Sequence, residues 1–217
     1  MAADDGGLVR YRMVVSAGGW QKGMQPPRQP LLDIPRRYVG EAPDIVKDLY
    51  RARLRKDDDG RLAAGHIYLK FDAAEMGSAG EPVKGQLSVV PKGLWPRIIM
   101  DMVTVAQSRY SGTFDPVLQL NRQRKLAVPP NADFIFYTDP KAQDFVWIQC
   151  RYENETRIGI DDPGRCSMDL MPADYVAVSI GFDSRELPLW RQRADRLRTL
   201  VPGWVRPESE WPPVVAD

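Results

Sequence analysis

The chain contains 217 residues, and its 30 Lys and Arg nearly balance its 29 Asp and Glu, which leaves a formal net charge of +1. With 43% hydrophobic and 27% charged residues, the composition is that of a globular protein and excludes a wholly disordered chain. So small a net charge argues against a nucleic-acid-binding protein that relies on a general basic field. The single histidine, His66, excludes any site that needs two histidines, including the His-Glu-x-x-His metalloproteases.

The start of the chain bears on the compartment in which the protein acts. Residues 1–7 read Met-Ala-Ala-Asp-Asp-Gly-Gly and carry neither the basic nor the apolar segment of a signal peptide. Ala-Ala followed by Asp-Asp nevertheless resembles what remains after cleavage at small residues, which favours an exported protein over a cytosolic one. No run of about 18 apolar residues occurs, so we expect no transmembrane helix.

Two segments in the first half of the chain have the alternation of a β-hairpin. Residues 46–55 and 66–72 alternate apolar and polar side chains on either side of Asp59-Gly60, a dipeptide typical of tight hairpin turns. We therefore predict a hairpin with one wet, basic face. Its acidic tip consists of Asp57, Asp58 and Asp59.

The other segments before residue 133 are less regular. Residues 8–15 alternate well enough to predict a strand, and residues 73–93 predict a loop with one short strand near 86–90. Residues 98–105 have the length of either a helix or a buried strand, and their β-branched side chains favour the strand. Residues 108–133 are polar and contain three prolines, so we expect mostly loop.

The last third of the chain predicts an antiparallel meander followed by one helix. Short apolar segments recur at even spacing, at residues 134–137, 145–152, 157–160, 166–171 and 175–182. Apolar residues then recur at steps of three and four, which places on one helical face Leu187, Trp190, Ala194, Leu197 and Val201. Pro188 suits the first turn of this helix, and Pro202-Gly203 ends it.

These segments predict an α+β fold, in which a mostly antiparallel sheet carries a C-terminal amphipathic helix packed on it. No internal repeat or clear linker divides the sequence. We therefore expect residues 1–217 to form a single domain, with residues 1–7 and 205–217 as extended tails.

The two cysteines flank the predicted reversal between neighbouring strands. Cys150 ends one apolar run, Cys166 begins another, and the turn sequence Asp-Asp-Pro-Gly lies between them. A disulfide here would close a loop of about 15 residues and stabilise the fold by about 3 kcal/mol. We favour this disulfide, which requires an oxidising compartment such as the periplasm. The alternative is a pair of buried free thiols.

The sequence offers no recognisable catalytic, metal or cofactor site. His66 is the only base for a Ser- or Cys-based triad, but it begins a predicted strand, and no Gly-x-Ser-x-Gly motif is present. The acidic run at Asp57, Asp58 and Asp59 lacks the spaced oxygen ligands and the late Glu of an EF-hand loop. We therefore predict no catalytic residues, no metal ligands and no cofactor.

The final predicted helix carries the most basic surface of the chain. Opposite its apolar face lie Arg191, Arg193, Arg196 and Arg198. Such a face suits an acidic protein partner or an anionic lipid surface, although a merely solvated helix face has the same pattern. Aromatic side chains do not alternate with these arginines, so we expect no nucleic-acid partner.

The C-terminal third contains a series of segments with a family resemblance. The series consists of Cys166-Ser-Met-Asp-Leu-Met, Tyr175-Val-Ala-Val-Ser-Ile-Gly-Phe, and Leu187-Pro-Leu-Trp followed by Leu197, Leu200 and Trp204. Earlier parts are Ile34-Pro35-Arg-Arg-Tyr38 and Trp95-Pro96. Together they resemble small exported proteobacterial proteins that are encoded beside type VI secretion effectors and are similar to effector immunity proteins. The resemblance implies an exported, partner-binding protein and assigns no catalytic residue.

We therefore predict a periplasmic immunity protein that binds a cognate antibacterial secreted effector, such as a membrane- or wall-degrading hydrolase, and blocks its active site or its access to substrate. The predicted contact residues are Asp57, Asp58 and Asp59 first, and then Arg191 and Arg198. Two alternatives stay open: a hydrolase with an unrecognised carboxylate site, and a non-catalytic adaptor of a secretion assembly. The hydrolase predicts a concave pocket that gathers several acids, whereas the adaptor predicts two free thiols.

Overall fold

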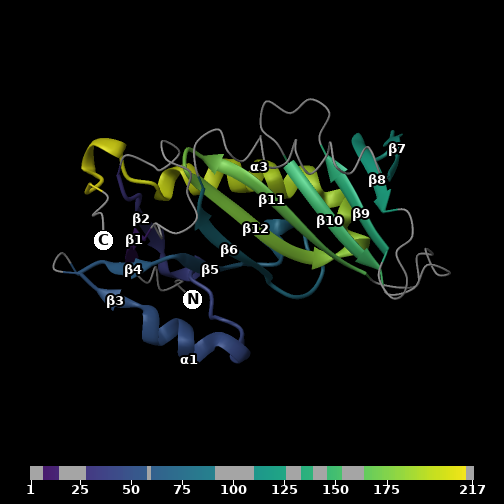
Figure 1. Cartoon of the computed structure of the whole chain (residues 1–217). Helices are drawn as coiled ribbons and strands as arrows, with labels where there is room; N and C mark the ends of the chain where they lie inside the picture. Colours follow the sequence, from purple (N-terminus) through teal and green to yellow (C-terminus); the bar gives the residue numbers. More distant parts are fainter. Residues whose placement is uncertain are drawn as a thin grey trace.

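The structure, a computed structural model, describes residues 7–14, 28–57, 60–90, 110–125, 133–138, 146–152 and 164–213. Within these ranges the chain forms a four-stranded sheet, an eight-stranded sheet, and the helices α1 (Asp44–Arg53) and α3 (Trp190–Leu200). Figure 1 shows α3 lying across one face of the larger sheet, while α1 projects beside the smaller one. This arrangement confirms the predicted α+β class.

The smaller sheet comes from the N-terminal part of the chain. Its order is β2-β1-β4-β3, and its strands are β1 (Leu8–Met13), β2 (Leu31–Pro35), β3 (Arg55–Lys56) and β4 (Leu62–Ala64). β1 runs antiparallel to β2 and parallel to β4, and β3 runs antiparallel to β4. Tyr11 and Met13 of β1 are both buried, as the predicted alternation in this strand requires.

Neighbouring strands of the larger sheet are all antiparallel, in the order β5-β6-β12-β11-β10-β9-β8-β7. β9 to β12 lie side by side in chain order, which confirms the predicted meander, although the predicted strand at 157–160 lies outside the described residues. The strands are β5 (His66–Phe71), β6 (Val83–Val89), β7 (Tyr110–Asp115), β8 (Leu120–Lys125), β9 (Asp133–Thr138), β10 (Val146–Tyr152), β11 (Arg165–Ala173) and β12 (Val176–Asp183).

The predicted C-terminal helix is present and covers this sheet. The chain leaves β12 through the 3₁₀ helix η5 (Ser184–Leu189), forms α3, and continues into a second 3₁₀ helix, η6 (Val201–Trp204). Every member of the predicted apolar stripe is 5% exposed or less. Pro188 lies in η5 and Pro202 in η6, so the prolines flank the α-helical segment and leave its hydrogen bonds intact.

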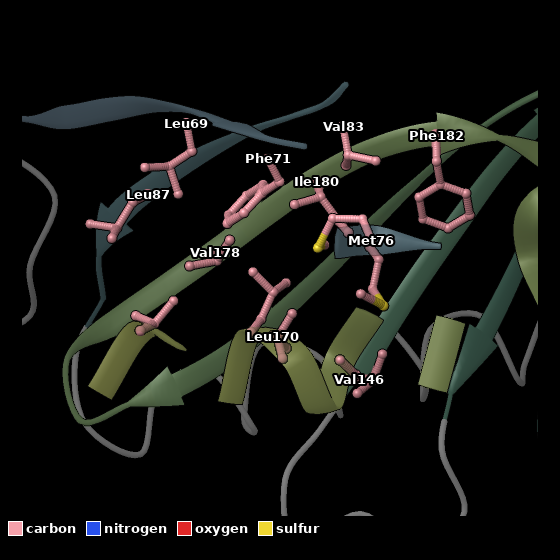
Figure 2. Packing of buried hydrophobic residues seen from close by; sticks show 14 of the residues in the cluster. Leu69, Phe71, Met76, Val83, Leu87, Val146, Leu170, Val178, Ile180 and Phe182 are labelled. Carbon is pink, nitrogen blue, oxygen red and sulfur yellow. The ribbon is translucent and has the colours of Figure 1, made fainter. Parts of the chain in front are cut away.

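A single hydrophobic core joins the two sheets. In Figure 2, Leu69 and Phe71 of β5 and Ile180 of β12 belong to a dense group of apolar side chains gathered on one side of the larger sheet. The same cluster reaches Tyr11 and Ile34 in the smaller sheet. The two sheets are therefore packed against each other through shared apolar side chains.

Helix α1 corrects the predicted hairpin, because Asp44–Arg53 form a helix and only Arg55 of the predicted strand is extended, in β3. Val46, Tyr50 and Leu54 recur every four residues, so this segment also satisfies a helical pattern. Tyr50 packs its ring on that of His66 in β5, with the centroids 5.4 Å apart. β5 pairs with β6 instead, and the predicted turn joins the short strands β3 and β4.

Strands β7 and β8 correct a second expectation, because residues 108–133 were predicted to be mostly loop. Here the two strands form a hairpin whose turn contains Pro116. Residues 98–105, for which a strand was favoured over a helix, lie outside the described residues.

The predicted C-terminal tail packs onto the smaller sheet over its described part. Val205 forms a bridge with Leu32 of β2, and the backbone N–H of Arg206 donates to the carbonyl of Leu31 at 2.9 Å. Trp211 is buried, and its indole N–H donates to the carbonyl of Arg206 at 2.8 Å. Residues 205–213 are therefore part of the packed fold.

Candidate partner-binding surface

The predicted acidic tip lies in the turn between β3 and β4. Asp57 accepts a hydrogen bond from the backbone N–H of Arg61 at 2.8 Å and pairs with the Nε of Arg12 at 3.2 Å. Its side chain is 9% exposed, so the carboxylate holds the turn against β1 and is not presented to solvent. Asp58 and Asp59 lie outside the described residues, and contact between this tip and a partner stays a prediction.

Three of the four arginines on the final helix reach the surface, among them the predicted contacts Arg191 and Arg198. Arg191 is exposed, and its guanidinium carbon lies 4.5 Å from the centroid of the Trp190 ring. Arg198 is partly exposed and pairs with Asp195, one turn earlier, at 3.0 Å. Both lie where a partner could contact them, and that role stays a prediction.

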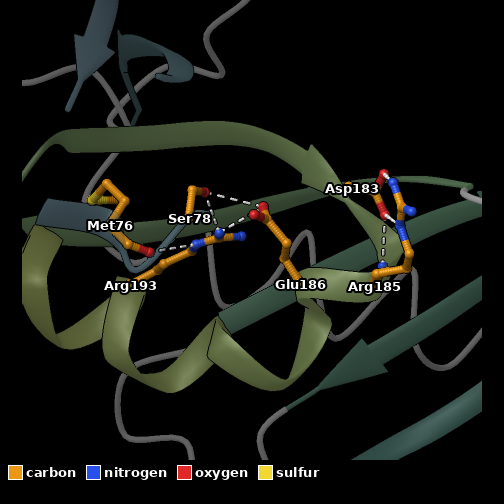
Figure 3. Close-up of polar contacts among 6 residues, drawn as sticks. All are labelled: Met76, Ser78, Asp183, Arg185, Glu186 and Arg193. Carbon is orange, nitrogen blue, oxygen red and sulfur yellow. Dashed lines mark hydrogen bonds and ion pairs between the residues drawn. The ribbon is translucent and has the colours of Figure 1, made fainter. Parts of the chain in front are cut away.

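Arg193 corrects the predicted solvent face, because its side chain is fully buried. Its Nε donates to the carbonyl of Met76 at 3.0 Å, and its Nη2 donates to the Oγ of Ser78 at 2.8 Å and to Glu186 at 2.7 Å (Figure 3). The guanidinium carbon also lies 4.6 Å from the centroid of the Phe182 ring. These contacts tie α3 to the segment after β5 and to η5.

Arg196 is likewise anchored, by a carboxylate on the 3₁₀ helix η3 (Ala74–Met76). Glu75 forms an ion pair with Arg196 and accepts a hydrogen bond from the hydroxyl of Tyr38 at 2.7 Å. Burial first, and then the contact with Glu75, raise the pKa of the Tyr38 phenol. The hydrogen bond with Glu75 also raises the pKa of Arg196. Two arginines of α3 therefore fasten η3 beneath the helix.

The start of η5 is fixed by a separate acidic cap. Asp183 accepts a hydrogen bond from the backbone N–H of Arg185 at 2.8 Å and two from its guanidinium, at 3.0 and 2.8 Å (Figure 3). The side-chain hydrogen bond from Arg185 holds the pKa of Asp183 below its ordinary value. This cap sets the direction in which the chain leaves β12 toward α3.

The predicted disulfide between Cys150 and Cys166 is confirmed. The two residues are direct partners in the antiparallel register of β10 and β11, and their Cα atoms lie 4.0 Å apart. Both are buried on the face that α3 covers. The bond therefore cross-links two neighbouring strands of the meander from within the core.

The turn between β7 and β8 presents apolar side chains that the sequence analysis did not single out. Val117 is 86% exposed and Phe114 is 49% exposed. One carboxylate oxygen of Asp115 accepts hydrogen bonds from the backbone N–H groups of Val117 and Leu118, both at 2.9 Å. We refer to residues 114–119 as the β7–β8 tip. The Asp-Pro dipeptide at its start is a turn signal that could have located it.

One carboxylate on the outer face of the larger sheet has a perturbed pKa. Asp169 of β11 lies opposite Ser179 of β12 in the register, and burial raises its pKa while a hydrogen bond with Ser179 opposes the shift. Among the residues that the structure describes, no group of three or more His, Cys, Asp or Glu side chains is placed to hold a metal ion. Nor is any helix in the described ranges long and apolar enough to span a membrane.

A similar fold occurs in a solved structure, that of an immunity protein of the Stenotrophomonas maltophilia type IV secretion system. The two chains share 11% sequence identity with a TM-score of 0.53, and the match covers 93% of this chain and 94% of the other. No family model matches the sequence, and no curated protein matches it. The likeness establishes a shared fold over nearly the whole length of both chains.

Proposed function

We propose that this protein is an immunity protein, which binds a secreted antibacterial effector and neutralises it. The observation that carries the proposal is the fold, because it matches that of an immunity protein of a secretion system across more than nine-tenths of both chains. The segments that resemble type VI effector immunity proteins support the same kind of function. On that resemblance we propose a type VI effector as the partner, and a type IV effector is the alternative that the structural relative favours.

A protein can neutralise an effector by binding alone. This requires a rigid surface that is complementary to the effector, and it requires no catalytic group. Inhibitors of this kind bury about 800 Å² on each partner and rely on a few aromatic and Arg anchors. Arg191 has the features of such an anchor, since its guanidinium is exposed and lies against the Trp190 ring. We propose Arg191 and Arg198 as contacts, together with the acidic tip, in which Asp57 would act by holding the turn in shape.

The proposed site of action is the periplasm. The disulfide between Cys150 and Cys166 supports this location, because such bonds persist in oxidising compartments. An effector that acts there would degrade the membrane or the cell wall, so we propose a hydrolase of this kind as the target. Binding would block its active site or its access to substrate.

Isothermal titration calorimetry with the effector encoded beside this protein's gene tests the proposal. We expect a complex with a dissociation constant below about 1 μM, since neutralisation requires binding that outlasts exposure to the effector. A secreted hydrolase of the same class from an unrelated system serves as the control and should give no heat. Absence of a complex with the cognate effector at micromolar concentrations would refute the immunity function.

A further inference from the structure

We propose that the β7–β8 tip is the principal anchor through which this protein engages its effector, and that it enters an apolar pocket with an acidic rim. The inference rests on the proposed immunity function and names the surface that performs it. The tip consists of Phe114, Asp115, Pro116, Val117, Leu118 and Gln119.

Apolar side chains are exposed together at the β7–β8 tip. Single exposed apolar residues are common on protein surfaces and need no explanation. At the tip, however, Val117 is 86% exposed and Phe114, three residues earlier, is 49% exposed. Such a pair is suited to fill a pocket, because burying apolar side chains at the centre of an interface supplies most of its affinity.

Hydrogen bonds within the chain fix the shape of the tip before any partner binds. Asp115 accepts the two backbone hydrogen bonds of the turn, and the side-chain amide of Gln119 donates to the carbonyl of Pro116 at 2.7 Å. The carbonyl of Leu118 accepts a hydrogen bond from the indole N–H of Trp190 at 3.0 Å, which fastens the turn to α3. A preordered loop loses little conformational entropy on binding.

The backbone of the same turn is strained at Gln119. Gln119 has a φ of +57°, in the left-handed region that residues with a side chain rarely adopt. Strained positions persist where the surrounding contacts hold them, and they concentrate at functional sites. The contacts at residues 115–119 hold this one.

The charge of Arg191 indicates the kind of pocket that the tip would enter. The carboxylate of Asp115 is occupied within the turn, whereas Arg191 is exposed beside Trp190, the residue that holds the tip. Among the described residues, no carboxylate forms an ion pair with Arg191. Arg191 is therefore an exposed cation beside the residue that holds the tip, and an acidic group on the rim of the partner's pocket would complement it.

A partner protein is favoured over a second copy of this chain. Two-fold pairing of tips would bring the Arg191 side chains of both copies toward each other, and like charges oppose such a contact. A lipid surface is disfavoured because two apolar side chains provide far less burial than the two anchoring signals that stable membrane attachment requires.

The test compares Val117→Asp and Arg191→Glu with Ile45→Asp as a matched control. Ile45 is 93% exposed and lies on α1, which Figure 1 shows far from β7 and β8. We expect the melting temperatures of all three variants to stay within about 2 °C of the wild type, since exposed substitutions change stability little. In calorimetry with the cognate effector, Val117→Asp should weaken binding at least about 30-fold and Arg191→Glu about tenfold, whereas Ile45→Asp should bind as the wild type does.

The outcomes separate this inference from the proposed function. If the wild type binds the effector and folded Val117→Asp binds equally well, the tip is not the anchor and the immunity function stands. If the wild type itself fails to bind, both fall. Sedimentation of the chain alone and with vesicles of phosphatidylethanolamine and phosphatidylglycerol completes the test. A dimer or a vesicle-bound fraction that Val117→Asp abolishes would overturn the assignment to an effector pocket.

Discussion

Among single residues, the buried Arg193 ties α3 to the segment after β5 and to η5. Its guanidinium contacts Met76, Ser78 and Glu186 while being fully buried. Arg193→Ala removes the cation and its hydrogen bond to the carbonyl of Met76, and it opens a cavity under the helix. Glu186 loses its charged partner but still accepts a hydrogen bond from the hydroxyl of Ser78 at 3.1 Å. We expect the free energy of unfolding to fall by about 2–3 kcal/mol, as measured by urea denaturation, since Glu186 is partly solvated.

Arg191→Ala is the matched control for this prediction. Arg191 occupies the same helix but is exposed, so its replacement should change the free energy of unfolding by less than about 0.5 kcal/mol. Equal losses in the two variants would contradict the role assigned to Arg193.

The sequence could not distinguish Arg193 from the other arginines of the helix. Its bonds to Met76 and Ser78 span 117 and 115 residues, so no local pattern reveals them. The apolar stripe of the same helix was predictable, because its spacing of three and four residues is local. The exposed Val117 was likewise missed, since it stands in a polar segment whose burial depends on the sheet around it.

Asp169 gives a prediction for the dependence of stability on pH. Burial raises its pKa in the folded chain above the ordinary value of 3.8, so the folded state favours the neutral carboxyl. At a pH below 3.8 the Asp169 carboxyl is neutral in both the folded and the unfolded chain. As the pH rises from there through the raised pKa, the unfolded chain ionises first, so the free energy of unfolding falls. We expect Asp169→Asn to be more stable than the wild type to urea at pH 7, with the difference shrinking toward pH 4. Destabilisation of equal size at both pH values would refute this.

Among the secondary-structure elements, β10 and β11 are joined by the disulfide between Cys150 and Cys166. The two cysteines are 16 residues apart in the sequence. In the chain-entropy model, closing a loop of this size stabilises the folded chain by about 3 kcal/mol. We expect the double variant Cys150→Ala/Cys166→Ala to lose about this free energy of unfolding in urea. Reductant should lower the free energy of unfolding of the wild type and leave that of the double variant unchanged. An unfolding transition of the wild type that does not shift in reductant would contradict the prediction.

The hairpin of β7 and β8 allows a test of whether the shape of its tip matters. Asp115→Ala removes the acceptor for the N–H groups of Val117 and Leu118 and should loosen the turn. We expect about a tenfold loss of affinity for the effector in calorimetry, with the free energy of unfolding changed by less than about 1 kcal/mol. Asp115→Asn keeps an acceptor oxygen for these N–H groups and should retain the affinity for the effector. An equal loss of affinity in both variants would show that the negative charge of Asp115 matters and that the shape of the turn does not.

Two predictions of secondary structure were wrong, for α1 and for β7 and β8. In α1 the strand and helix repeats coincide, and in β8 neither repeat is visible. In α1, Tyr50 and Leu54 fit both a two-residue and a four-residue repeat, and packing on β5 selects the helix. In β8, charged side chains hide the strand, and only its pairing with β7 and β9 reveals it. The meander of β9 to β12 was predictable because each strand carries a clear apolar run and pairs with its neighbour in sequence.

For the whole molecule, the order of strands was beyond prediction because it depends on contacts between distant segments. β6 lies between β5 and β12, so a strand from the first half of the chain completes the C-terminal sheet. The smaller sheet then packs on the same core, and Figure 1 shows α1 beside that sheet, far from β7 and β8 at the outer edge of the larger sheet.

The most direct measurement of the proposed immunity role is the hydrolytic activity of the cognate effector titrated with this protein. We expect the activity to fall linearly to zero as the protein approaches a stoichiometric amount, and to fall much less with Val117→Asp at the same concentrations. Full activity in the presence of a several-fold excess of folded wild-type protein would contradict the account.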